Sequence, residues 1–154
     1  MEKEPYNIGS LTVMCNVMHD LGKHEEALMG LDTLIKLQPK EIGPYINKGF
    51  ELEALGKYEE AIDAYNAAAE MDGKQPFVFS NRGHAYYMLK RYDEALKDLN
   101  KSIMNEPMNE FAYHTRALVY IANDNMDRAC KDLETAQAMG AKGEVRDLIR
   151  KHCR

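Results

Sequence analysis

The sequence predicts an all-α protein made of four repeated helix pairs, and three observations support this fold class. Alanine recurs at intervals of 34 residues without a slip, at Ala27, Ala61, Ala95 and Ala129. Apolar side chains between these alanines recur at spacings of three and four, which is typical of amphipathic helices. Glycine or proline separates many of the apolar stretches. A fixed period of this length indicates stacked repeats, each of which buries an apolar face against the next.

The helices are expected at fixed places within each repeat, two helices to a repeat. Their expected ranges are 8–20 and 24–37, 42–55 and 58–71, 76–89 and 92–105, and 110–123 and 126–138. Gly22 and Gly56 can adopt the left-handed conformation that ends a helix tightly. Pro39 and Pro107 are expected to stop the second helix of their repeats, because proline lacks an N–H and restricts the residue before it.

Two further columns of the repeat predict how the helices pack. A large residue begins each repeat, at Leu11, Tyr45, Phe79 and Tyr113. Four residues later comes a small one, at Cys15, Gly49, Gly83 and Ala117. Small side chains let two helices approach closely, and the large ones then interlock around the contact.

The segment after the fourth repeat is expected to form a capping helix over residues 144–152. Val145, Leu148 and Ile149 share one face of this helix. Basic residues outnumber acidic ones near the C-terminus, and a solubilising cap is favoured over a binding patch for them.

This 34-residue pattern of aromatic, Leu-Gly, tyrosine, alanine and proline positions resembles the tetratricopeptide repeat (TPR) family. The resemblance covers four contiguous repeats, 8–41, 42–75, 76–109 and 110–143, and with the cap it implies a single domain over 1–154. It also implies a right-handed α-solenoid of antiparallel helix pairs, the TPR superhelix, with the first helix of each pair lining a concave groove.

The resemblance assigns specific residues to a peptide-binding groove. They are Asn16, His19, Asn47, Phe50, Glu53, Phe77, Asn81, His84, Tyr87, Phe111, His114 and Leu118. Asn47 and Asn81 occupy the same column, and their amides could bind a peptide backbone whose groups recur regularly. The aromatic side chains could accept apolar side chains of the ligand, although some of them could instead pack between repeats.

The family also has a well-defined clamp for the C-terminal carboxylate of chaperone tails, which the sequence disfavours here. The clamp needs lysine, arginine and asparagine side chains from three successive repeats. Asn81 matches its middle member, but Ile46 and Phe50 replace the first pair and Phe111 and Thr115 the last. A carboxylate would be poorly held without those cations.

Several other function classes find no support. The net charge of −5 and pI of about 5.6 disfavour nucleic acid as a partner, because an acidic surface repels phosphates. No phosphate-binding glycine loop, GxSxG or HExxH motif occurs, so we expect no enzyme and no cofactor. His84, His114 and His19 could meet around a metal, but no carboxylate or cysteine obviously joins them, and we expect none bound.

The cysteines and the N-terminus indicate the cellular compartment of the protein. Cys15 and Cys130 are expected to be packed and inert, and Cys153 exposed; their spacing fits no zinc pattern. A reducing compartment is then the simplest interpretation. No apolar stretch could span a membrane or serve as a leader, so we expect a cytoplasmic protein, or an exported one if a leader has been removed. The fourth repeat resembles closing repeats of bacterial TPR proteins and favours a bacterial source.

The sequence therefore predicts a non-enzymatic interaction module that binds a protein or peptide in its groove. The alternative is structural self-association, as a homo-oligomer or as a fragment of a longer TPR array. Pro5 supports the longer array because it shares a column with Pro39 and Pro107, whereas Met1 and Lys3 weigh against it. A third possibility is an accessory regulator of an enzyme, for which the chain offers no signal.

Overall fold

The structure is a computed structural model that describes residues 7–153. Within this range the chain forms nine α-helices and no strand: α1 (Ile8–Asp20), α2 (His24–Leu37), α3 (Ile42–Ala54), α4 (Tyr58–Met71), α5 (Pro76–Met88), α6 (Tyr92–Asn105), α7 (Glu110–Ala122), α8 (Met126–Ala138) and α9 (Glu144–His152). The predicted all-α fold is confirmed, with every helix within one residue of its expected range. None of these helices is long and apolar enough to cross a bilayer.

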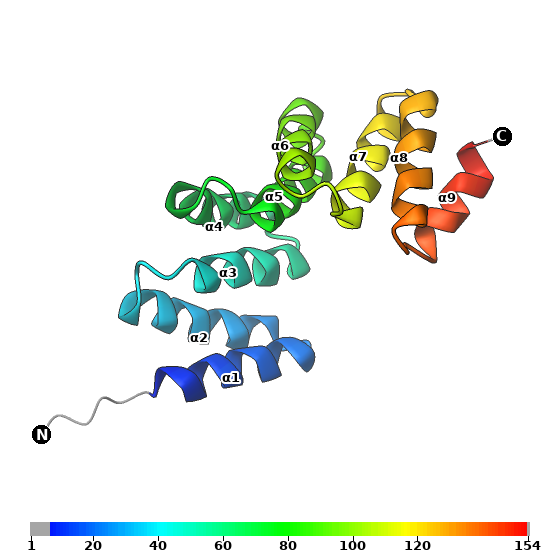
Figure 1. Ribbon diagram of the computed structural model, residues 1–154. Coiled ribbons are helices and arrows are strands. Elements are labelled where there is room, and N and C mark those ends of the chain that lie inside the picture. Colours follow the sequence, from blue (N-terminus) through cyan, green and yellow to red (C-terminus); the bar gives the residue numbers. More distant parts are fainter. Residues whose placement is uncertain (1–6, 154) are drawn as a thin grey trace, which may run out of the picture. The chain divides into compact units, whose positions relative to one another are not determined.

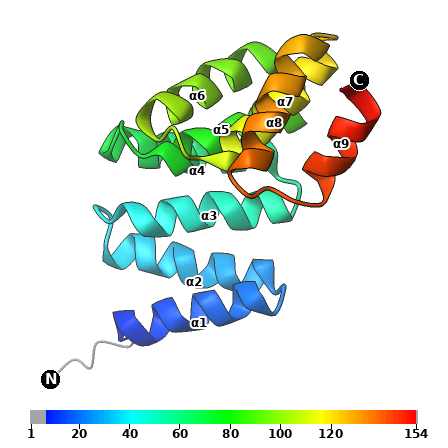
Figure 2. The ribbon, with the colours of Figure 1, turned by 45° about the vertical axis from the view of Figure 1, so that its right-hand side comes forward.

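The chain divides into two compact units, Met1–Gly73 and Lys74–Arg154, which we call the N-terminal and C-terminal units. In the N-terminal unit, α1 to α4 form two antiparallel pairs, and α2 packs directly on α3 (Figure 1). In the C-terminal unit, α5 to α8 form the other two pairs, and α9 lies beside α8 (Figure 2). A single domain over 1–154 stays a prediction. Pro5, Met1 and Lys3, which bear on the longer-array alternative, lie outside the described residues.

The turn inside each helix pair has one backbone conformation throughout the chain. Gly22 and Gly56 have φ values of 69° and 72°, which confirms the predicted left-handed helix ends. The equivalent residues of the third and fourth repeats, Lys90 and Asp124, adopt φ values of 59° and 55° without being glycine. The repeat geometry therefore imposes this conformation even where the side chain disfavours it.

The small columns of the repeat lie where helices touch. The four recurring alanines are all fully buried. A Cβ added to Gly49 would lie 2.4 Å from the Tyr65 ring, and one added to Gly83 would lie 2.8 Å from Leu99 Cγ. Both distances are below van der Waals contact, so the predicted close approach of the two helices depends on glycine at these positions.

The predicted capping helix forms as α9 and covers the last helix pair. Val145 is buried, and Leu148 and Ile149 pack beside it against a core that includes Ala129 and Leu133. The apolar side of α8 is thereby shielded from water. A repeat array needs such a cover on its last repeat.

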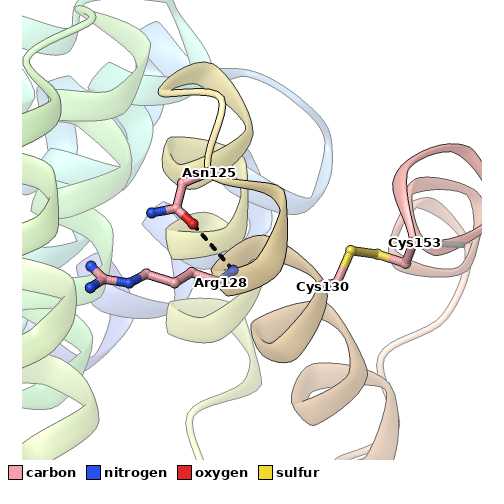
Figure 3. The surroundings of a disulfide bond; sticks show 4 residues. All are labelled: Asn125, Arg128, Cys130 and Cys153. Carbon is pink, nitrogen blue, oxygen red and sulfur yellow. Dashed lines mark hydrogen bonds between the residues drawn. A yellow bond between two sulfur atoms is a disulfide. The ribbon is translucent and has the colours of Figure 1, made fainter.

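The prediction for two of the cysteines is wrong. Cys130 of α8 and Cys153, directly after α9, form a disulfide, and both are half-buried (Figure 3). The cause is the return of α9 along α8, which brings residues 23 apart in sequence to a Cα–Cα distance of 5.5 Å. Cys15 is buried and free, as expected. The inference of a reducing compartment loses its support, because it rested on cysteines that do not pair.

Candidate functional site: the first helix of each pair

In the N-terminal unit, α1 and α3 place four predicted groove residues around one hollow. A spacing of three puts Asn16 and His19 on one face of α1, and Asn47 and Phe50 on one face of α3. Together they line a cavity of about 90 Å³, with Cys15, Leu31 and Glu51 as its other lining residues. The sequence therefore identified residues from separate helices that meet in space.

A larger cavity of about 390 Å³ shares Asn16 and Asn47 with this hollow. Thr12 lies one helical turn before Asn16 and lines it too, while Gln38 and Glu41 extend it toward the α2–α3 turn. Amides, a hydroxyl and a carboxylate therefore border two neighbouring cavities along α1 and α3. Glu53, also predicted for the groove, is half-buried on α3 and is not among the residues that line these two cavities.

A buried carboxylate at the end of the hollow was missed by sequence reasoning. Glu51 Oε1 lies 2.7 Å from His19 Nδ1, and Glu51 Oε2 lies 2.7 Å from His24 Nδ1. The Glu51 side chain is only 4% exposed. The signal was present in the repeat columns, because the position of Glu51 is apolar in the other three repeats, where it holds Val17, Ala85 and Val119.

In the C-terminal unit, α5 and α7 contact each other and gather aromatic groove residues. The ring centroid of His84 lies 5.6 Å from that of Phe111 and 6.3 Å from that of Tyr87. Tyr87 in turn lies 6.2 Å from Tyr92 at the start of α6. Three of the predicted residues, His84, Tyr87 and Phe111, therefore form one ring cluster on α5 and α7.

Glu144, the first residue of the cap, also faces this cluster and was not predicted. Its Oε2 lies 3.7 Å from Nε2 of His114. Burial lowers the pKa of His114, and the charge of Glu144 opposes that change, while His84 adds to it. Burial raises the pKa of Tyr87, and Tyr92 and Glu144 raise it further. The cap therefore places a carboxylate near His114 and Tyr87 as well as covering α8.

The remaining predicted residues lie outside the ring cluster. Phe77 is exposed on α5, Asn81 is half-buried on α5 and Leu118 is half-buried on α7. Asn81 belongs to the C-terminal unit and Asn47 to the N-terminal unit, so their regular spacing along one groove stays a prediction.

Two models of repeat families match parts of the sequence. The family model described as "TPR repeat" matches residues 49–90, and the one described as "Tetratricopeptide repeat" matches residues 76–109. A solved structure of the first TPR of Spaghetti (RPAP3), bound to the HSP90 peptide SRMEEVD, is 30% identical to this chain; the match covers 70% of this chain and 86% of that one, with a TM-score of 0.67. The chain belongs to the tetratricopeptide repeat family.

Other TPR structures extend the match over more of the chain. The thermophilic TPR protein TTC0263 of Thermus thermophilus is 20% identical, covers 97% of this chain and 82% of its own, and gives a TM-score of 0.82. MamA from Desulfovibrio magneticus RS-1 is 19% identical; the match covers 86% of this chain and 75% of that one, with a TM-score of 0.77. Both share the TPR fold with this chain. Among curated proteins, none matches the sequence.

Tetratricopeptide repeats are protein-interaction scaffolds, and this general role applies to the chain. The positions that a carboxylate clamp would need hold no cation in this TPR protein. Phe50 and Phe111 are exposed there, and Thr115 is buried. The ligand, the compartment and the bacterial source stay predictions.

Proposed function

We propose that the chain binds an extended segment of a partner protein along the first helix of each pair, α1 and α3 in the N-terminal unit and α5 and α7 in the C-terminal unit, without catalysing a reaction. The observation that carries this function is the hollow of the N-terminal unit. Asn16 and Asn47 both border it, and an amide side chain can donate to and accept from a peptide backbone. Phe50 lies at its edge with 48% of its surface exposed, where an apolar ligand side chain could cover it.

The RPAP3 relative supports a peptide as the ligand, since its structure contains one. The residues of this chain favour a different means of holding it. With phenylalanine at Phe50 and Phe111 in place of clamp residues, contacts to backbone and apolar side chains replace contacts to a terminal carboxylate. We expect the peptide SRMEEVD to bind no more tightly with a free C-terminus than as its C-terminal amide.

The test is a pull-down with the full chain, followed by affinity measurement on the segment that is retained. The double variant Asn47→Ala/Asn81→Ala removes both column amides and should weaken that segment's affinity at least about tenfold, the effect of losing two ligand hydrogen bonds. Gln137→Ala is the matched control. It removes an exposed amide from α8, which is the second helix of its pair and not one of the helices proposed to bind the ligand. If the double variant retains the same partners at the same affinity, the amides have no such role.

A second candidate function, self-association, is favoured by an exposed apolar surface on α1 and α2. Met14, Val17 and Met29 are all exposed, and Met14 and Met29 line a cavity of about 390 Å³. In later repeats the column of Val17 is buried, as Ala85 and Val119 show. A second copy of the chain could cover this surface in the way a neighbouring repeat would.

Light scattering over a range of concentrations separates the two candidates. Self-association through this surface predicts a mass above 17.6 kDa that falls on dilution and in a Met14→Lys/Met29→Lys variant. A constant monomer mass at every concentration would remove self-association and leave peptide binding as the function.

A further inference from the structure

Two imidazoles and one buried carboxylate meet at a single point in the N-terminal unit. His19 comes from the last turn of α1, His24 is the first residue of α2, and Glu51 lies on α3. Each oxygen of Glu51 lies 2.7 Å from one imidazole nitrogen. The two histidine side chains remain partly exposed, at 39% and 26%, while the carboxylate is buried.

The repeat fold does not require these polar groups. The column of Glu51 holds valine or alanine in the other repeats, and the column of His24 holds Tyr58, Tyr92 and Met126. Burying a carboxylate costs free energy unless a partner compensates it. Two departures from the repeat pattern at one point, Glu51 and His24, therefore indicate a site that serves something other than folding.

The donor set is the one that zinc prefers. Zn²⁺ binds imidazole nitrogen and carboxylate oxygen at about 2.0–2.2 Å, and sets of two histidines with one glutamate occur in its sites. Here one donor atom from each residue lies within 4.8 Å of the other two. Tetrahedral bonds of that length need donors roughly 3.5 Å apart. Small rotations of the two partly exposed imidazoles would close the difference.

We propose that His19, His24 and Glu51 bind one Zn²⁺ ion. His19 and Glu51 also line the cavity of about 90 Å³, which is large enough for a water molecule as the fourth ligand. Among residues 7–153, His19, His24 and Glu51 are the group of three histidine, cysteine or acidic side chains whose ligand atoms lie close enough together to hold a metal ion. His114 in the C-terminal unit has Glu144 as its carboxylate neighbour at 3.7 Å, but that side chain is exposed.

The experiment is a zinc titration of the full chain by competition with a chromogenic chelator, using ZnCl₂ alone as the probe. We expect one Zn²⁺ per chain. His24→Gln and Glu51→Gln should each lower the affinity at least about tenfold, the loss seen even when a group supporting a metal ligand is removed. Gln at position 51 keeps the size and hydrogen-bonding capacity of the buried side chain, and His24 is partly exposed, so circular dichroism should show both variants folded.

His84→Gln is the matched control, because it removes a partly exposed histidine from the C-terminal unit. It should leave the affinity unchanged, and MgCl₂ should not compete, since Mg²⁺ prefers oxygen ligands. No zinc binding by the parent chain, or an equal loss in His84→Gln and His24→Gln, would overturn the site. No partner peptide is needed, so these results are independent of the groove function.

Discussion

The two units join their helix pairs differently at the same repeat positions. In the C-terminal unit, Arg82 pairs with Asp98 through two hydrogen bonds of 2.6 and 2.8 Å, and Arg116 pairs with Asp132 through bonds of 2.7 and 2.8 Å. In the N-terminal unit the same two columns hold Met14 with Gly30, and Lys48 with Ala64. One repeat geometry therefore accommodates a buried ion pair between its two helices at these positions, or residues that cannot form one.

The basic residues Lys48 and Arg116, which occupy the same repeat position, each contact a polar side chain of the preceding repeat. Lys48 reaches Asp32 of the preceding repeat at 2.7 Å, and Arg116 also donates to Asn100 of its preceding repeat at 2.7 Å. The Lys48 pair is exposed, whereas the Asp98 side chain is 6% exposed. Hydrogen bonds to Asp98 raise the pKa of Arg82, so that guanidinium stays charged. Burial, rather than distance, distinguishes the two kinds of pair.

The largest expected effect comes from breaking the buried pair. Asp98→Ala should lower the free energy of unfolding by about 3–5 kcal/mol, because it leaves the Arg82 charge buried without its carboxylate. Asp32→Ala breaks the exposed pair and should cost less than about 1 kcal/mol. Urea denaturation followed by circular dichroism measures both. Equal losses in the two variants would show that burial does not set the strength of these pairs.

The disulfide gives the next largest difference between the units, since it occurs in the C-terminal unit alone among the described residues. Closing a loop of 23 residues stabilises a chain by about 3 kcal/mol, so reduction should lower the stability of the C-terminal unit by that amount. Hydrogen exchange should show faster opening in α8 and α9 and no change in α1 and α2. Cys153→Ser should reproduce the reduced protein, and Cys15→Ser is the control. Three free thiols in the unreduced protein would contradict the pairing.

The contrast between the units also shows what sequence reasoning can and cannot reach. Helix bounds followed from the 34-residue period, because each helix end repeats at the same column. Asn16, His19, Asn47 and Phe50 were assigned to a groove by the resemblance to the TPR family, and in the structure they line one cavity. Glu51 and His24 were not predicted as site residues, because they lie in columns that the family uses for packing. The disulfide was not predicted, because α9 lies outside the repeats and no periodicity fixes the direction of this helix.

The smallest expected effect concerns the turn inside each helix pair. Lys90 N donates to Tyr87 O at 2.9 Å, and Gly56 N donates to Glu53 O at 2.8 Å, so both turns have the same geometry. A left-handed backbone costs a non-glycine residue about 1–2 kcal/mol, partly offset by the greater freedom of glycine in the unfolded chain. Lys90→Gly should therefore stabilise the protein by about 0.5–1 kcal/mol.

The reciprocal change, Gly56→Lys, should destabilise the N-terminal unit by a similar amount, because it places in that unit the strain now carried by Lys90. Thermal unfolding is measured for both variants and for the Lys90→Gly/Gly56→Lys combination. The combination should leave the total stability nearly unchanged, since the two sites lie in different units. A gain from Lys90→Gly without a matching loss from Gly56→Lys would mean that the two units tolerate the left-handed turn differently, and that the contrast between them extends from side chains to the backbone.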